Sequence, residues 1–411
     1  MRPDSKRVAV VVAGAGARGG YEAGALSVLI PTLEAAGVKI SMYVGTSAGA
    51  INATIFAGLA HLPPADQAQQ ALDVWRTISV SNVFRSPTVT SPDVAARFVG
   101  QMLRVPGVKL VSLLDTEPLR REAGLAINWE QLSANITDKS LTLAVVATSG
   151  GDNRTVVFVQ RGNGEWLPPS DDERPIDYVS AQIRPAHVLA SSAIPIGFPP
   201  VRIENPPQAA GWYVDGGVRL NAPLKPAISL GADALVVVAT HPEKDDKQAT
   251  PRPNPPPPDV DDMVVRLIDV VLVDRMVEDL RTLSKINALT ALVSGSGPGS
   301  PGGALTPGGR PRKVIPYIFV GPDTRERLGL LANEILNKRH RPSGGVAQML
   351  RDFELRVLGH ALEGEGPRRG DLFSYLYFDQ EFIEESIKLG QDDANAYFDA
   401  LSSDKAMWRT H

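Results

Sequence analysis

Three short segments of the sequence hold residue types that together could hydrolyse an ester. The segment Gly45-Thr46-Ser47-Ala48-Gly49 has the spacing of a nucleophile elbow, in which small neighbours leave a serine exposed at a sharp turn. It lies between the apolar runs Ile40 to Val44 and Ala50 to Leu59, which are predicted to form a strand and a helix. The motif requires this context, so Ser47 is a candidate nucleophile, with Gly45 and Gly49 allowing the turn.

A second glycine-rich segment, Gly14 to Gly19, comes directly after the valine-rich run Arg7 to Ala13. It matches Gly-x-Gly-x-x-Gly, the pattern of a dinucleotide-binding turn, but the next predicted strand, Ile40 to Val44, offers no acidic residue for the ribose. A hydrolase instead needs backbone N–H groups near the attacked carbonyl, and a glycine loop that leads into a helix supplies them. A tight turn that binds nothing is the other interpretation of this segment.

The third segment is Asp215-Gly216-Gly217, which follows the short apolar run Trp212 to Val214. This run could place the Asp215 carboxylate at the end of a strand. Taken alone, an aspartate before glycine predicts only a turn, because this pair is among the commonest turn signals.

Other chemistries use some of the same residues. His187 and His241 both follow Ser47 in the chain, as a Ser-His-Asp esterase of another α/β type would require, although neither lies in a recognisable turn motif. A catalytically inactive lipid-binding module and a nucleotide-binding module are the further alternatives. The acidic runs at 171–173 and 261–262 lie near prolines and are interpreted as solvated loops, and the few histidines show no metal-binding spacing.

The order of the motifs along the chain resembles the patatin-like phospholipase family, and its bacterial members in particular. The motifs are the glycine-rich loop with Arg18, the elbow at Ser47, the segment Ala190 to Pro195, and Asp215-Gly216-Gly217 followed by Asn221 and Pro223. The resemblance extends from about Arg7 to Thr240.

This resemblance implies a fold and a set of site residues. The fold is a three-layer α/β/α sandwich of the patatin type, with a mostly parallel central sheet and a helical C-terminal extension. Ser47 is the implied nucleophile and Asp215 its dyad partner. The implied oxyanion and substrate-binding residues are Gly14, Ala15, Gly16, Arg18 and Gly19. Ala15 stands where the family commonly has glycine, and a left-handed backbone there would cost alanine about 1 kcal/mol.

The resemblance also implies the activity. It is that of a serine lipid acyl hydrolase, a phospholipase A or lipid esterase, which acts through an acyl-enzyme and needs no cofactor or metal. The implied substrate is a phospholipid or an acylglycerol, so we expect peripheral contact with lipid surfaces. The segment Val80 to Val108 is a candidate cap over the site, with packing on the core as the other interpretation.

Composition narrows the remaining classes of function. The chain has 411 residues, of which 43% are hydrophobic and 21% are charged, as in an ordinary globular protein. A formal net charge of -4 and a pI of about 5.9 give no sign of a nucleic-acid partner. Because the sequence has no cysteine, disulfides, thiolate metal sites and a cysteine nucleophile are excluded.

The chain divides by composition into four parts. We expect a patatin-like catalytic core at 1–241, a proline-rich linker or loop at 242–259, a helix, a Gly/Pro loop and a strand returning to the core at 260–323, and a helical C-terminal extension at 324–411. The runs Leu141 to Thr148, Thr155 to Gln160 and Ala234 to Thr240 are predicted to be strands of one sheet. Residues Leu372 to Leu401 are predicted to form a docked pair of amphipathic helices.

The N-terminus has some features of a secretory signal. Arg2, Lys6 and Arg7 precede the apolar run Val8 to Ala13. The run is short, and cleavage after it would delete the first strand and the glycine loop, so a cytoplasmic location is expected, with peripheral contact at a membrane surface. The longest apolar stretch, Val44 to Ala60, begins with a turn and contains polar residues, which predicts a buried helix.

Overall fold

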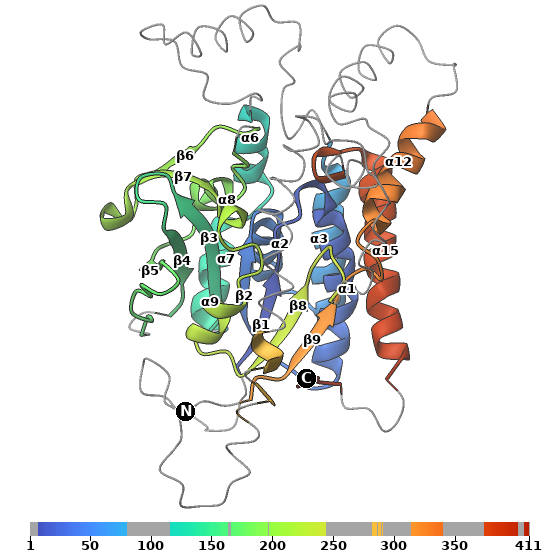
Figure 1. The fold of residues 1–411 in the computed structure, drawn as a ribbon, viewed down its shortest axis with the longest axis horizontal. Helices are drawn as coiled ribbons and strands as arrows, with labels where there is room; N and C mark the ends of the chain where they lie inside the picture. Colours follow the sequence, from blue (N-terminus) through green and yellow to red (C-terminus); the bar gives the residue numbers. More distant parts are fainter. Residues whose placement is uncertain are drawn as a thin grey trace, which may run out of the picture.

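A nine-stranded sheet forms the centre of the protein in the computed structural model (Figure 1). The structure describes residues 7–79, 116–162, 166–195, 197–243, 314–339, 374–401 and 407–410, together with 282–285, 287, 288 and 290. The strands are β1 (Val8–Val12), β2 (Ile40–Thr46), β3 (Thr142–Ser149), β4 (Thr155–Gln160), β5 (Ile176–Ser180), β6 (Val201–Ile203), β7 (Gly211–Asp215), β8 (Ala234–Val238) and β9 (Tyr317–Val320).

The sheet is mostly parallel, as the sequence predicts. Its main order is β5-β4-β3-β2-β1-β8-β9. The five strands from β3 to β9 along this order are all parallel neighbours, whereas β4 runs antiparallel to β3 and parallel to β5. A short strand, β7, pairs antiparallel with both β3 and β6.

Helices cover both faces of the sheet and complete three layers. The α-helices are α1 (Gly19–Ala35), α2 (Ala48–Gly58), α3 (Pro64–Thr77), α6 (Glu117–Leu125), α7 (Trp129–Asp138), α8 (Pro185–Ser191), α9 (Leu224–Ser229), α12 (Arg327–Arg339) and α15 (Gln380–Asp399). Helices α1, α2, α7 and α8 pack their apolar residues on one face, and α9 packs on the other. The fold is therefore a three-layer α/β/α sandwich with a mostly parallel sheet, as the resemblance implies.

Burial on both faces explains why β1 is a continuous apolar run rather than an alternating one. Every residue of β1 is buried. Val10 and Val12 belong to the cluster under α1 and α2, while Ala9 and Val11 belong to the cluster under α9. A strand of a parallel sheet that is covered on both sides needs apolar residues at every position.

The first two strand-turn-helix units follow the prediction. Helix α1 begins at Gly19, where the glycine-rich loop ends, as predicted. It ends where Gly37 adopts a φ of +79° and donates its N–H to the carbonyl of Glu34. Glycine tolerates this left-handed backbone, which explains its place just after the helix.

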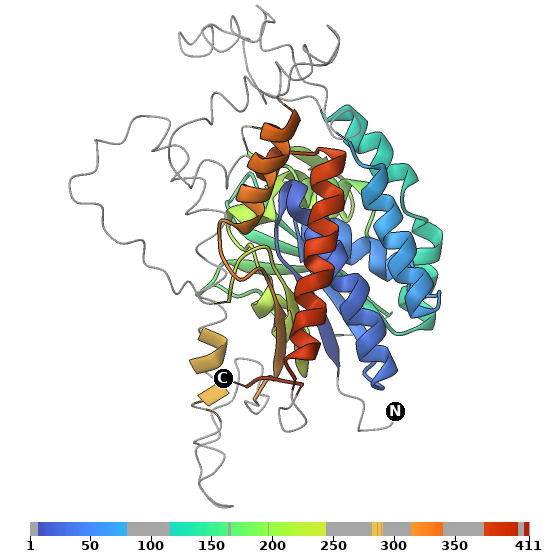
Figure 2. The ribbon, with the colours of Figure 1, turned by 90° about the vertical axis from the view of Figure 1, so that its right-hand side faces the viewer.

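The C-terminal part of the chain packs directly on the core. Within the predicted helix pair over Leu372 to Leu401, residues 374–376 are helical and the twenty-residue helix α15 follows after a three-residue break, while 372–373 lie outside the described residues. Figures 1 and 2 show α15 alongside α1. The two backbones approach closely at glycines: a Cβ on Gly24 would lie 2.1 Å from the Ile387 carbonyl oxygen, and a Cβ on Gly390 would lie 2.0 Å from that of Tyr21.

Some predictions concern residues outside the described ranges. The candidate cap at Val80 to Val108 and nearly all of the proline-rich segment 242–259 lie there. So does most of the segment 260–313, which is predicted to hold a helix and the Gly/Pro loop. The domain boundaries at 241, 259 and 323 stay predictions. Among the helices in the described ranges, none is long and apolar enough to cross a membrane.

Candidate active site

The pairing of β3 brings Ser47 and Asp215 together. Strand β2 runs along one edge of β3 and ends with Thr46 opposite Val146. Strand β7 continues along the same edge from the next position, with Asp215 opposite Ala147. Because β2 turns away into α2 where β7 arrives from the other direction, the residue after β2 and the last residue of β7 become neighbours.

The two side chains form a short hydrogen bond. The Ser47 hydroxyl donates to Asp215 Oδ2 over 2.6 Å, and the Gly217 N–H donates to Oδ1 over 2.6 Å. Asp215 is buried, and its burial raises the pKa of its carboxyl from 3.8 to about 7, because the charged form is poorly solvated. The hydrogen bonds from Ser47 and Gly217 oppose this rise. A carboxyl with such a pKa exchanges protons near neutral pH.

Ser47 has the strained backbone expected of a nucleophile elbow. Its φ is 55° and its ψ is -128°, a combination that residues other than glycine rarely adopt. Ser191, at the end of α8, stabilises this conformation: its Oγ accepts the Ser47 N–H over 2.9 Å and donates to the Val146 carbonyl over 2.5 Å. Ser191 lies in the Ala190 to Pro195 motif, but no local sequence pattern indicates this role for it.

Glycines at the elbow are required by close backbone contacts. A Cβ on Gly45 would lie 2.2 Å from the Gly49 carbonyl oxygen, and a Cβ on Gly49 would lie 2.2 Å from that of Ala13. Gly216 has the same constraint, since a Cβ there would lie 2.3 Å from the Val146 carbonyl oxygen. Any side chain at these positions would force the strand and the helix apart.

The glycine-rich loop lies beside Ser47, but its first amide is already occupied. The Gly14 N–H donates to the carbonyl oxygen of Asn221 over 3.1 Å and to its side-chain Oδ1 over 3.0 Å. In the described part of the chain, no hydrogen bond occupies the N–H of Ala15 or Gly16. These two amides, rather than that of Gly14, are the candidate oxyanion donors. Asn221 is one of the residues that carry the family resemblance, but the sequence alone indicates no role for it.

The left-handed residue of this loop is Gly16, not Ala15. Ala15 has a φ of -137° and a ψ of -13°, so alanine pays no cost for a left-handed backbone there. Gly16 has a φ of +56° and begins a short 3-10 turn, Gly16–Arg18, that leads into α1. The expected strain at Ala15 is therefore absent.

Arg18 and Gly19 make packing contacts. Arg18 is fully buried, and its Nε donates to the Ser374 hydroxyl over 2.7 Å. A Cβ on Gly19 would lie 2.2 Å from the ring of Trp75. Both residues therefore pack behind the loop. Ser374, the partner of Arg18, belongs to a segment near the C-terminus for which the sequence predicted no contact with the site.

The two histidines considered as bases have other partners. His187 accepts the Arg184 N–H at Nδ1 over 3.1 Å, and its Nε2 lies 3.1 Å from the Asn205 carbonyl, so Nε2 carries the proton. Burial lowers the pKa of His187 and favours this neutral form. His241 Nε2 lies 2.5 Å from the hydroxyl of Tyr375. Within the described residues, no hydrogen bond joins either ring to Ser47.

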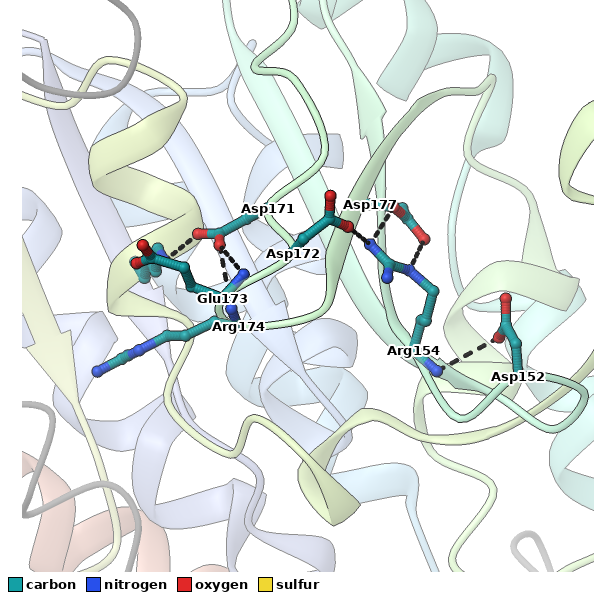
Figure 3. A network of polar contacts seen from close by, with 8 residues as sticks. Asp152, Arg154, Asp171, Asp172, Glu173, Arg174 and Asp177 are labelled. Carbon is teal, nitrogen blue, oxygen red and sulfur yellow. Dashed lines mark hydrogen bonds and ion pairs between the residues drawn. The ribbon is translucent and has the colours of Figure 1, made fainter.

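The acidic run at 171–173 is a turn in which Asp172 and Glu173 are exposed, as predicted, and Asp171 is partly buried. Asp171 accepts hydrogen bonds from the backbone of Glu173 and Arg174 and from the Lys225 ammonium group (Figure 3). Arg154 bridges this run to β5, because it pairs with Asp172 at 3.2 Å and with Asp177 at 2.6 Å. This network ties the sheet edge together.

Comparisons with known proteins identify the family of this chain. The profile of the patatin-like phospholipase family matches residues 10–228, which is 219 of the 411 residues and includes Ser47 and Asp215. A search of curated proteins gives no match. The crystal structure of VipD from Legionella pneumophila aligns over 95% of this chain and 88% of its own, at 12% identity and a TM-score of 0.32. The family match shows that the chain belongs to the patatin-like phospholipase family, and this membership indicates lipid acyl hydrolase activity in general.

Proposed function

We propose that this protein hydrolyses ester bonds in lipids that carry fatty acyl chains, phospholipids or acylglycerols, with Ser47 as nucleophile and Asp215 as its base. The observation that carries the proposal is the 2.6 Å hydrogen bond from the Ser47 hydroxyl to the buried Asp215 carboxylate. The strained backbone of Ser47 and the unoccupied amides of Ala15 and Gly16 support the same chemistry.

The first half of the reaction forms an acyl-enzyme. Ser47 Oγ attacks the acyl carbonyl carbon while its proton moves to Asp215 Oδ2. The carbonyl oxygen takes up the negative charge and accepts hydrogen bonds from Ala15 and Gly16. The tetrahedral intermediate then collapses, the bond to the alcohol oxygen breaks, and Asp215 returns the proton to that leaving oxygen.

The second half regenerates the serine. A water molecule gives its proton to Asp215 and attacks the carbonyl carbon of the acyl-enzyme. Collapse of the second intermediate breaks the bond to Ser47 Oγ, which recovers its proton from Asp215, and the fatty acid leaves. All bonds and protons balance with Ser47, Asp215 and water, so this scheme uses no cofactor.

Burial makes an aspartate competent for this task. A solvated aspartate has a pKa near 4 and is a weak base toward an alcohol. The pKa of Asp215, raised to about 7 by burial, brings its basicity close to that of a histidine. The remaining lowering of the activation barrier comes from proton transfer that is concerted with the attack and from the oxyanion donors.

The substrate class also bears on location. An acyl chain held in a bilayer or droplet can reach the site only if the protein contacts the lipid surface, so we propose a cytoplasmic protein that associates with such surfaces reversibly. Two results would support reversible association with lipid surfaces. Activity should be higher on vesicles than on a short-chain ester, and it should increase with the fraction of protein bound to vesicles in a flotation assay.

The experiment that tests the reaction is labelling with a fluorophosphonate probe, combined with turnover of a short-chain nitrophenyl ester. Wild type is expected to be labelled on Ser47 and to turn over the ester, and Ser47→Ala to do neither while remaining folded by circular dichroism. Mass spectrometry locates the label. A wild type that is folded yet unlabelled, and inactive on esters, phospholipids and acylglycerols, would instead favour an inactive lipid-binding module.

A further inference from the structure

A segment near the C-terminus, 374–379, lies against the oxyanion loop, although it is far outside the family match at 10–228. Its backbone touches the loop at the left-handed residue. A Cβ on Gly16 would lie 2.3 Å from the Tyr375 carbonyl oxygen and 3.3 Å from the Tyr375 ring. Gly16 is therefore required both by its φ of +56° and by the segment that covers it.

Side chains of the segment also hold Arg18, the last residue of the loop's 3-10 turn. The Arg18 Nε donates to Ser374 Oγ over 2.7 Å, and its guanidinium lies 4.1 Å from the centroid of the Tyr375 ring. The Tyr375 hydroxyl lies 2.5 Å from His241 Nε2, and the two rings stack. His241 follows shortly after β8, so this contact connects the segment to the sheet.

Helix α15 fixes the segment in place. Asp379 caps the helix by accepting the N–H groups of Glu381 and Phe382. Tyr377 and Phe382 pack in an apolar cluster that includes Ala17 of the loop. Because α15 packs along α1, it anchors the C-terminal end of segment 374–379 to the core. This contact is additional to the one between Tyr375 and His241.

We propose that Ser374 and Tyr375 are positioning residues for the oxyanion loop, so that the C-terminal segment 374–379 completes a site whose other residues lie in the family-matched segment. A loop with a left-handed residue and unpaired amides does not define its own conformation. The segment restrains it at Gly16 and at Arg18, the first and last residues of the 3-10 turn. Donors that stabilise an oxyanion must be placed before the reaction begins, and small displacements reduce the rate strongly.

The inference rests on the proposed function for its kinetic readout, and a matched pair of serine substitutions tests it. Ser374 and Ser386 are both buried and belong to the same C-terminal region, but only Ser374 bonds to Arg18. Ser374→Ala is expected to lower kcat on a soluble ester about tenfold with KM changed less than twofold, since misplaced oxyanion donors affect mainly the transition state. Ser386→Ala is expected to leave both constants unchanged.

Active-site titration separates positioning from loss of folded protein. The rate is divided by the fraction of Ser47 that a fluorophosphonate labels at completion. An unchanged rate per labelled serine in Ser374→Ala, or an equal loss in Ser386→Ala, would overturn the proposal. Tyr375→Phe keeps the ring over Arg18 and the backbone contact at Gly16, so it is expected to retain more activity than Tyr375→Leu. Equal loss in these two variants would contradict the role of the ring.

Hydrogen exchange gives a readout that does not depend on turnover. In Ser374→Ala, the amides of Ala15 to Gly19 are expected to exchange faster than in wild type, with no change in Ser386→Ala. If wild type proves inactive, the proposed reaction fails, yet this exchange result still supports the contact. Identical exchange in Ser374→Ala and wild type would overturn the positioning role itself.

Discussion

Two regions of the sheet hold aspartates in opposite environments. At the junction of β2, β3 and β7, Asp215 is buried, with the Ser47 hydroxyl and the Gly217 N–H as its described partners, and burial raises the pKa of its carboxyl to about 7. At the β4–β5 edge, Asp177 accepts two hydrogen bonds from Arg154, at 2.6 and 2.9 Å, and this guanidinium lowers the pKa of Asp177 below 3.8 (Figure 3).

The difference shows what makes an aspartate a base rather than a structural anion. Both residues lie on strands of one sheet. Asp177 is partly exposed and has a cation, so its charge is stabilised and its affinity for a proton falls. In the described structure Asp215 is neither exposed nor paired with a cation, so its carboxyl holds a proton more readily. The predictions below test this contrast, from the largest expected effect to the smallest.

The largest effect is expected from Asp215→Asn, which should lower kcat/KM at least about a thousandfold, because the amide cannot take the Ser47 proton. Asp177→Asn removes a similar carboxylate from the other region and should leave kcat/KM within about twofold. Steady-state turnover of a soluble ester measures both. Comparable losses in the two variants, with folded protein in each, would show that the contrast has no bearing on catalysis.

The pH dependence of wild type should report the raised pKa. The base must be ionised to accept the Ser47 proton, so kcat/KM should rise about tenfold per pH unit below a midpoint near 7 and level off above it. A midpoint near 4 would place the base in a solvated environment.

Because a histidine would titrate in the same range, His187→Gln and His241→Gln are the controls. His241→Gln should change the height of the profile through Tyr375, but neither variant should move the midpoint.

The stability of the two regions should depend on pH in opposite directions. The folded pKa of Asp215 lies above its unfolded value of 3.8, so the folded state loses stability as the pH rises from about 4 to about 7. Asp215→Asn removes this loss, and its free energy of unfolding relative to wild type should increase across that window by at most roughly 4 kcal/mol.

For Asp177 the sign is reversed. Its pKa is lowered in the folded state, so its contribution is present above pH 4 and is lost as the pH falls through the lowered value. Asp177→Asn should therefore be slightly less stable than wild type at neutral pH, with the difference vanishing in acid. Denaturant unfolding between pH 4 and pH 9 checks the Asp215 window, and its extension below pH 4 checks Asp177. Slopes of the same sign for the two variants would contradict the assigned pKa directions.

The sequence predicted the parts of the site that local patterns carry. The β1-α1-β2-α2 order follows from apolar runs separated by glycine turns, and Ser47 and Asp215 lie in short motifs with recognisable neighbours. Ser191, Asn221 and Ser374 could not be assigned roles in the same way, because their partners are 144, 207 and 356 residues away in sequence. Their function comes from the folded contact and leaves no spacing to detect.

Contacts of two further segments could not be predicted for the same reason. The acidic run at 171–173 is the predicted exposed turn, but its polar composition does not show that Lys225 and Arg154 reach it from other elements. The aromatic residues before α15 lie in a segment that is helical at 374–376, and they pack beside the oxyanion loop. Their amphipathic pattern predicts a helix but not this tertiary contact.

The smallest expected effect concerns the backbone. Ser47 and Asn153 are both non-glycine residues with positive φ, 55° and 57°. Asn153 lies in the exposed β3–β4 connection, between Asp152 and Arg154, where asparagine tolerates a left-handed backbone. Ser47 pairs its φ with a ψ of -128°, a combination suited only to glycine. Strain should therefore be larger at Ser47.

Comparing glycine with alanine at each position isolates this strain, since neither residue keeps the original side-chain hydrogen bonds. Alanine normally makes a protein more stable than glycine, because it reduces the entropy of the unfolded chain. At position 47 the order should reverse: Ser47→Gly should exceed Ser47→Ala in free energy of unfolding by about 1–3 kcal/mol. At position 153 the same difference should be about 1 kcal/mol or less.

Measurements at pH 5, where Asp215 is mostly protonated in all variants, prevent its charge from contributing. If Ser47→Ala is as stable as Ser47→Gly, the elbow stores no strain, and the sharp turn at Ser47 then depends on the close glycine contacts at Gly45 and Gly49 alone.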